Sequence, residues 1–246
     1  MPIAIDDIRE IDDVLSALDE VIVEGVADGH RWVLFAALYR RMTLAVKRAI
    51  ERDAFDDGPR MSRFDAIFAR RFFAPLRAHL QGDPVPRAWQ VAFDAARDPG
   101  LTAMQILLLG VNAHINLDLG FSVIEAGLEP GPFREDFERI NAILAEELDI
   151  VQRALGEVSP WLEGIDRLMG RADERLGVFV LVRARAQAWS VAVSDAPVEG
   201  EIDLEAARLG ERIARPGFVL GLFVRMIRCR ESWTVADLVR RFERLG

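Results

Sequence analysis

The sequence predicts an all-α fold, and three observations support this prediction. Apolar residues recur along most of the 246 residues at the spacing of three and four that gives a helix one buried face. No stretch alternates apolar and polar residues between hairpin turns. Clusters of glycine, proline and aspartate separate the periodic stretches. We therefore expect a single all-α domain, residues 1–246, in which about nine to eleven helices form a bundle around a buried central helix.

The first two helices are expected at 5–24 and 31–52. Each of these ranges carries an apolar stripe and a charged back, and a turn at 27–30 joins them. The acidic loop RDAFDDGPR then interrupts the pattern with glycine and proline. We expect the chain to leave the second helix and turn within this loop.

The third helix is expected to open at Ser62, with Asp65 as the reciprocal partner of a capping box. Pro75 should kink this helix or end its first half, because proline lacks the amide hydrogen that a helix interior needs. A short helix is expected at Arg87–Arg97. The sequence Asp-Pro-Gly at 98–100 then forms the turn into the central helix.

The second half of the chain is expected to be helical as well. The stretch at 133–157 is amphipathic and acidic, which is typical of a helix on the outside of a bundle. Thr234 with Asp237 predicts a final capped helix. The remaining helices are expected at 161–169, 171–194, 203–214 and 216–230.

The stretch at 105–127, QILLLGVNAHINLDLGFSVIEAG, is largely apolar but contains polar residues that are costly to bury without partners. At about 100° per residue, His114, Asp118 and Glu125 lie within about 40° of one another on one helical face. Asn112 and Asn116 lie on the other side. Polar residues on two sides, with apolar residues between them, indicate a helix surrounded by protein, so we expect this to be the central helix.

His114 and Asp118 are four residues apart, so their side chains meet on one helical face. The carboxylate can orient the imidazole and make it a better general base. Alternatively, the two side chains can hold one divalent metal ion, with Glu125 or Asp65 as the third ligand. A third interpretation is structural, because a satisfied buried polar network also fixes how helices pack. The sequence leaves all three interpretations open.

Five further residues are candidates for catalysis or ligand contact. Tyr39 is the only tyrosine, and it shares a face of the second helix with Thr43, where it can donate a proton or a hydrogen bond. The amides of Asn112 and Asn116 can position a ligand or bind backbone groups. Arg183 lies among apolar residues, so it needs a buried acid or the anionic group of a substrate.

Charge and cysteine content narrow the classes of partner. The formal net charge is -9 and the basic residues are dispersed, which argues against binding nucleic acid through its phosphates. Cys229 is the only cysteine, so no internal disulfide can form, and the N-terminus lacks a signal-peptide pattern; we expect a cytoplasmic protein. The most apolar stretches contain charged residues, so we expect no membrane span. A small molecule is the expected ligand.

Four motifs carry a resemblance to known proteins: YRRMT, FDDGPRMSRFDAIFARRF, AWQVAF and LLLGVNAHINLDLG. Together they resemble a family of bacterial all-helical proteins of unknown function, over most of the chain. The last motif is also similar to a helix of the zinc-dependent phospholipase C and single-strand nuclease superfamily, in which a histidine and an aspartate four residues later bind metal. That second resemblance implies a metal-binding role for His114 and Asp118.

These observations lead to three functional hypotheses. The first is a hydrolase of a small ester or phosphoester, in which His114 and Asp118 bind a divalent ion that activates water, or act as an acid/base pair. The second is a metal-free pocket that binds or isomerises an apolar small molecule, with contacts from Tyr39, His114 and the asparagines. The third is a structural or interaction protein whose buried polar groups only specify helix packing.

Overall fold

The computed structural model describes residues 4–127, 130–158, 183–194, 197–229 and 231–244. This part of the chain is helical and contains no strand, which confirms the predicted all-α class. One cluster of buried apolar side chains includes residues from Ile5 to Phe242. The helix expected at 161–169 and the first part of that expected at 171–194 lie outside the described residues.

The first long helix, α1 (Ile11–Ala27), begins later than the sequence predicts. A single 3-10 turn, η1 (Ile5–Asp7), precedes it. Helix α1 begins at this point because Glu10 and Asp13 form a capping box, in which the side chain of each residue accepts a hydrogen bond from the backbone amide of the other residue. The second helix, α2 (Val33–Glu51), lies within its predicted range.

The third helix, α3 (Gly58–Gln81), begins four residues before Ser62, so the predicted start was wrong. Asp57 is the N-cap, and its carboxylate accepts a hydrogen bond from the Arg60 amide at 2.8 Å. The Ser62 hydroxyl instead accepts from the backbone amide of Ile11, at 3.0 Å. The helix continues past Pro75 to residue 81 without a break.

The central helix runs from Ala103 to Glu125 in three consecutive parts: α5 (Ala103–Asn112), a π-helical segment η2 (Ala113–Asp118), and α6 (Leu119–Glu125). Its start is fixed by a capping box between Thr102 and Gln105. It is long and apolar enough to cross a membrane, with a mean hydropathy of 1.4, but 83% of its most apolar window is buried in the bundle. This burial fits the predicted core helix.

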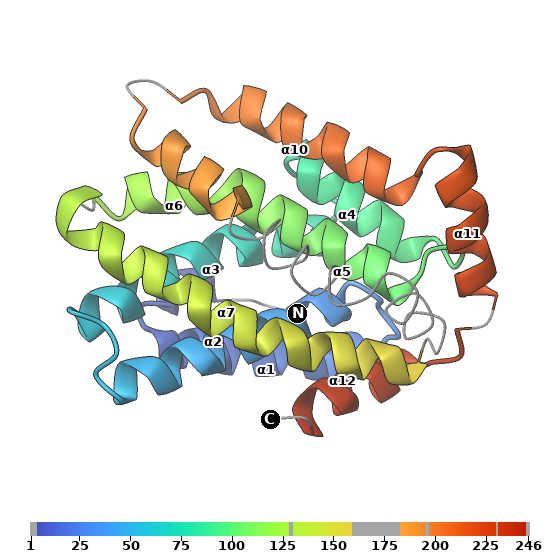
Figure 1. Cartoon of the computed structure of the whole chain (residues 1–246), viewed down its shortest axis with the longest axis horizontal. Helices are drawn as coiled ribbons and strands as arrows, with labels where there is room; N and C mark the ends of the chain where they lie inside the picture. Colours follow the sequence, from blue (N-terminus) through green and yellow to red (C-terminus); the bar gives the residue numbers. More distant parts are fainter. Residues whose placement is uncertain (1–3, 128–129, 159–182, 195–196, 230, 245–246) are drawn as a thin grey trace.

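Helices α2, α3, α4 and α10 pack around this one (Figure 1). The short helix α4 has its predicted bounds, and α10 packs against both α4 and the central helix. Helix α7 crosses the bundle and packs against α2 and α12. A further helix covers 183–192. The bounds of these outer helices are Arg87–Arg97 for α4, Pro130–Val158 for α7, Glu199–Ala214 for α10, Phe218–Arg228 for α11 and Val235–Arg244 for α12.

Helix α7 is attached to the loop between α2 and α3 by the fully buried carboxylate of Asp136. This carboxylate accepts hydrogen bonds from the Asp56 amide at 2.8 Å and from the side chains of Arg60 and Arg139 at 2.7 and 2.8 Å. Burial acts to raise the pKa of Asp136, but these hydrogen bonds outweigh it and hold the pKa below its usual value. The acidic loop is therefore ordered by α7.

The packing of Phe35 of α2 against the central helix depends on Gly110. A Cβ atom at this position would lie 2.4 Å from Cγ of Phe35, deep inside the core. We expect Gly110→Ala to lower the free energy of unfolding by about 1–3 kcal/mol, because Phe35 must leave its place. Urea denaturation measures this change.

Gly200 is the matched control, because a Cβ atom there meets nothing within 4 Å. Gly200→Ala, also in a helix, should leave stability unchanged or raise it by up to about 1 kcal/mol. Equal stabilities of the two variants would contradict the described packing of Phe35 on the central helix.

Candidate functional site

Side chains from four helices meet around His114 and its neighbour Tyr39. On α2, three residues at successive four-residue intervals face the site, and on α3 three more share one face. Helix α4 adds one aromatic ring, and the π-helical segment adds the imidazole and a carboxylate. These residues are Phe35, Tyr39 and Thr43 on α2, Asp65, Phe68 and Phe72 on α3, Trp89 on α4, and His114 and Asp118 on η2; all are buried.

His114 and Asp118 form the contact that the sequence predicts. The Nδ1 atom of His114 lies 3.0 Å from Oδ2 of Asp118, and both residues are only 3% exposed. The indole N–H of Trp89 donates to the same carboxylate oxygen, also at 3.0 Å. The three side chains form a chain of hydrogen bonds that fixes the imidazole in one orientation. A π-helical segment at this point is notable because such segments occur frequently at functional sites.

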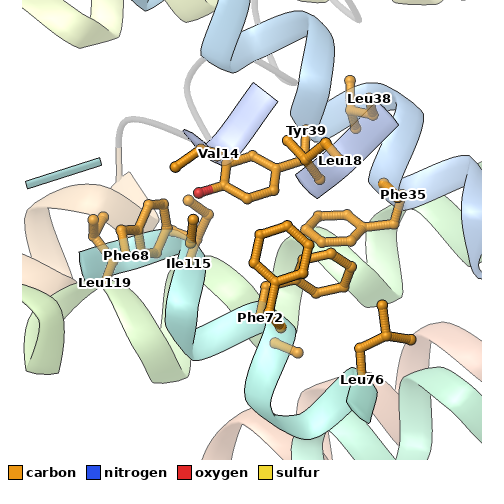
Figure 2. Packing of buried hydrophobic residues seen from close by; sticks show 14 of the residues in the cluster. Val14, Leu18, Phe35, Leu38, Tyr39, Phe68, Phe72, Leu76, Ile115 and Leu119 are labelled. Atoms are coloured by element: carbon orange, nitrogen blue, oxygen red, sulfur yellow. The ribbon is translucent and has the colours of Figure 1, made fainter. Parts of the chain in front are cut away.

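Aromatic rings enclose the imidazole of His114. The ring of Phe68 is stacked on it with a centroid separation of 3.6 Å, and the ring of Tyr39 meets it edge-on at 4.6 Å. Phe35 and Phe72 complete this aromatic enclosure at 5.7 and 6.3 Å. Figure 2 shows Phe35, Tyr39, Phe68 and Phe72 packed together, with the Tyr39 hydroxyl directed toward Phe68. The imidazole therefore lies in an apolar environment.

This environment determines the charges of the pair. Burial lowers the pKa of His114 well below its usual value and raises that of Asp118 well above its usual value. Both directions favour uncharged side chains. With both groups uncharged, the protonated carboxyl of Asp118 donates to Nδ1, and the proton of the neutral ring lies on Nε2, which faces away from Asp118.

Four polar atoms of this site have no hydrogen-bond partner among the described residues: Nε2 of His114, Oη of Tyr39, Oγ1 of Thr43 and Oδ2 of Asp65. Burial raises the pKa of Tyr39 well above its usual value, and the nearby charge of Asp65 adds to this effect. The Thr43 hydroxyl lies close enough to act in the opposite direction, although neither hydroxyl makes a well-formed hydrogen bond. Buried polar atoms are normally satisfied, so these four require an explanation.

Asp65 lies inside α3, whereas the sequence predicts it in the first turn of that helix. The capping role was wrong, because α3 begins earlier and Asp65 lies within the helix, 8% exposed. Burial raises the pKa of its carboxyl to about 7. The signal that was available in the sequence is the spacing of Asp65, Phe68 and Phe72, which places all three on one face.

The structure does not bring Glu125 to His114 and Asp118. Its carboxylate lies 3.3 Å from Nε of Arg71 and 3.7 Å from Nη2 of Arg70, and its side chain is 45% exposed. A π-helical turn contains more residues than an α-helical turn, so it rotates the residues that follow away from the predicted face. Across the described ranges, no three His, Cys, Asp or Glu side chains are grouped to hold a metal ion.

Asn112 connects the central helix to α10, and Asn116 binds Asn112 within the central helix. The side-chain amide of Asn112 donates to the carbonyl of Ala206 on α10 at 2.8 Å, and the amide of Asn116 donates to Oδ1 of Asn112 at 2.9 Å. Arg183, a candidate for ligand contact in the sequence, is exposed. Its neighbour Arg185 is the buried arginine instead, and it donates to Oδ1 of Asn141 at 2.7 Å and to a carbonyl of α7. These contacts serve helix packing.

A model of a family of unknown function, DUF5995, matches residues 11–217. The chain belongs to this family. The match includes every residue of the aromatic enclosure and the His114–Asp118 pair of this DUF5995 protein. Searches of curated proteins and of solved structures each gave no match. The resemblance to the phospholipase C superfamily has no support from these comparisons.

The buried carboxyl of Asp65 should make the free energy of unfolding depend on pH. Because its pKa is about 7 in the folded state and about 4 in the unfolded state, the folded state binds the additional proton between these values. The contribution of Asp65 to the free energy of unfolding should therefore fall by up to about 4 kcal/mol as pH rises through this window. Urea denaturation of the wild type and of Asp65→Asn across this range measures it.

As pH rises to about 7, the free energy of unfolding of Asp65→Asn should increase relative to that of the wild type. Above this pH the difference between the two free energies should stay constant. Asp136→Asn is the control, because the pKa of Asp136 is lowered and its effect should change only near and below about pH 4. A constant difference for Asp65→Asn across the window would show that this carboxyl is not buried as described.

Proposed function

We propose that this protein binds a small, mainly apolar molecule at Nε2 of His114 and transfers a proton on it without a metal. The observation that carries this proposal is the unpartnered Nε2 atom inside the aromatic enclosure, on an imidazole that is held by Asp118. A purely structural histidine would normally have both ring nitrogens satisfied. This one presents a proton-accepting or proton-donating atom to the inside of the protein.

The His114–Asp118 pair has the parts of a general base. When the pair has released one proton to solvent, Nδ1 carries the remaining proton against the Asp118 carboxylate, and Nε2 has a free lone pair that can accept a proton from a bound molecule. The imidazolium formed in this step is stabilised by the Asp118 carboxylate at 3.0 Å. Trp89 keeps the carboxylate in position through its own hydrogen bond. The low basicity that burial imposes makes the return of the proton easy.

Tyr39 and Asp65 supply the complementary acid. The Tyr39 hydroxyl stays protonated because its pKa is raised, and a carboxyl with a pKa of about 7 is about half protonated in neutral solution and largely protonated in slightly acid solution. Two such groups can donate hydrogen bonds to an oxygen atom on which negative charge develops. A β,γ-unsaturated ketone fits: Nε2 removes a proton from the carbon between the carbonyl group and the C=C bond and returns it to the far carbon of that bond, so the C=C bond moves next to the carbonyl group.

The size of the ligand is limited by the packing. Aromatic rings fill the space around the imidazole, so only a small molecule can reach Nε2, and its entry requires a local opening of the helices. The alternative of a metal-dependent ester or phosphoester hydrolase needs a third metal ligand, and Glu125 is held elsewhere by arginines. The metal-free interpretation is therefore better supported.

Ligand-observed NMR on protein treated with a metal chelator tests the proposal, with phenol and cyclohexanone as probes. We expect both probes to bind the wild type, and His114→Gln to abolish binding. Tyr39→Phe, which removes only the hydroxyl, should weaken it about tenfold because one hydrogen bond is lost. Catalysis would appear as loss of the cyclohexanone α-proton signals in D2O, dependent on His114.

Ser122→Ala is the matched control for these variants. Ser122 is fully buried on the central helix, but its hydroxyl already donates to the carbonyl of Asp118 at 2.8 Å. It should leave probe binding unchanged, and circular dichroism should show equal helical content in all variants. Absence of probe binding, or binding that survives in His114→Gln, would overturn the proposal and support a structural role.

Elemental analysis of untagged protein separates the metal-free and metal-dependent interpretations. We expect no stoichiometric metal in the wild type or in His114→Ala, because the described residues offer His114 and Asp118 without a third ligand. About one metal ion per chain in the wild type, lost in His114→Ala, would instead support the hydrolase and would call for a screen of esters and phosphoesters.

A further inference from the structure

Helix α11 presents an apolar stripe to solvent. Phe218 is 89% exposed, Leu222 57% and Met226 53%, and their four-residue spacing places them on one face. Ile227, on the opposite face, is buried and anchors the helix to the bundle. Figure 1 shows α11 at one end of the molecule, after the turn that ends α10. The stripe Phe218, Leu222 and Met226 is thus turned away from the core that the described residues form.

The charges around this stripe differ from those of the whole chain. Within its 11 residues, FVLGLFVRMIR, α11 has two arginines and no acid, although the chain carries a net charge of -9. Arg225 is exposed beside the stripe, and Arg212 and Arg215 are exposed just before the helix. Glu211 is the acid next to them. The apolar stripe is therefore bordered mainly by positive charge.

We propose that α11 is a docking helix that lies in the plane of an anionic lipid surface. An amphipathic helix with Phe, Leu and Met on one side and arginines at its border binds at the interface between headgroups and acyl chains. The stripe would enter the acyl boundary, and Arg212, Arg215 and Arg225 would contact lipid phosphates. Such binding is peripheral and is separate from the burial of the central helix.

A second copy of the chain fits this apolar stripe less well than a lipid surface does. Two α11 helices packed on each other would bring like-charged arginines together, and that repulsion is costly. Three side chains also supply only a few hundred Å2, whereas a stable dimer needs about 800 Å2 from each partner. Binding to a lipid surface does not require so large a contact area. The lipid phosphates attract the arginines, and the acyl chains rearrange around an inserted aromatic ring.

Co-sedimentation of the full chain with lipid vesicles tests this proposal. Vesicles of phosphatidylcholine mixed with phosphatidylglycerol should bind the wild type, and vesicles of phosphatidylcholine alone should bind it much more weakly. Leu222→Asp should lower the apparent affinity about tenfold or more, because it places a charge in the acyl boundary. Arg225→Gln should lower it less and should reduce its sensitivity to salt.

Val198→Asp is the matched control, because Val198 is an apolar residue with a similar exposed fraction, 54%, at the start of α10. It should bind vesicles like the wild type. The proposal fails if the wild type does not bind the anionic vesicles, if it binds both kinds of vesicle equally, or if the two aspartate variants lose binding equally. A concentration-dependent dimer that Leu222→Asp abolishes would assign the stripe to a second copy and would also overturn it.

Discussion

The structure depends most on how the bundle buries the His114–Asp118 pair. An imidazole and a carboxylate that are each 3% exposed would be costly to remove from water without partners. The pair meets this requirement through its own contact and through the indole of Trp89. Helix α4 must therefore dock with Trp89 against η2, and α2 and α3 must close the remaining sides with aromatic rings. The positions of four helices follow from this constraint.

The same site contains the least satisfied part of the core. In most cores the polar groups are fully paired, and residues that remain unpaired are commonly functional. The unpartnered atoms of Tyr39, Thr43 and Asp65 lie on α2 and α3, whereas the satisfied contacts of Asp118 lie on the side of α4. The site is thus held rigidly on one side and leaves free hydrogen-bonding capacity on the other, as a ligand-binding or proton-transfer site requires.

Much of this arrangement follows from the sequence, and the exceptions have physical causes. Helical periodicity predicts the all-α class, and the four-residue spacing predicts the contact of His114 with Asp118. The position of Glu125 was not predictable from ideal helical angles, because the π-helical segment changes the rotation of the chain before it. The start of α3, and with it the capping role of Asp65, was predicted wrongly. Asp57 and Ser62 are both acceptable N-cap residues, and only tertiary packing decides between them.

The central claim is that His114 is a neutral imidazole with one ring nitrogen left for a ligand. Side-chain nitrogen NMR of the protein, recorded between about pH 5 and about pH 8, tests it most directly. The account predicts one protonated ring nitrogen and no titration in this range, because burial holds the pKa of His114 well below its usual value. A His114 ring that gains a second proton near its ordinary pKa of about 6.5 would contradict the account, since it would show a solvated imidazole.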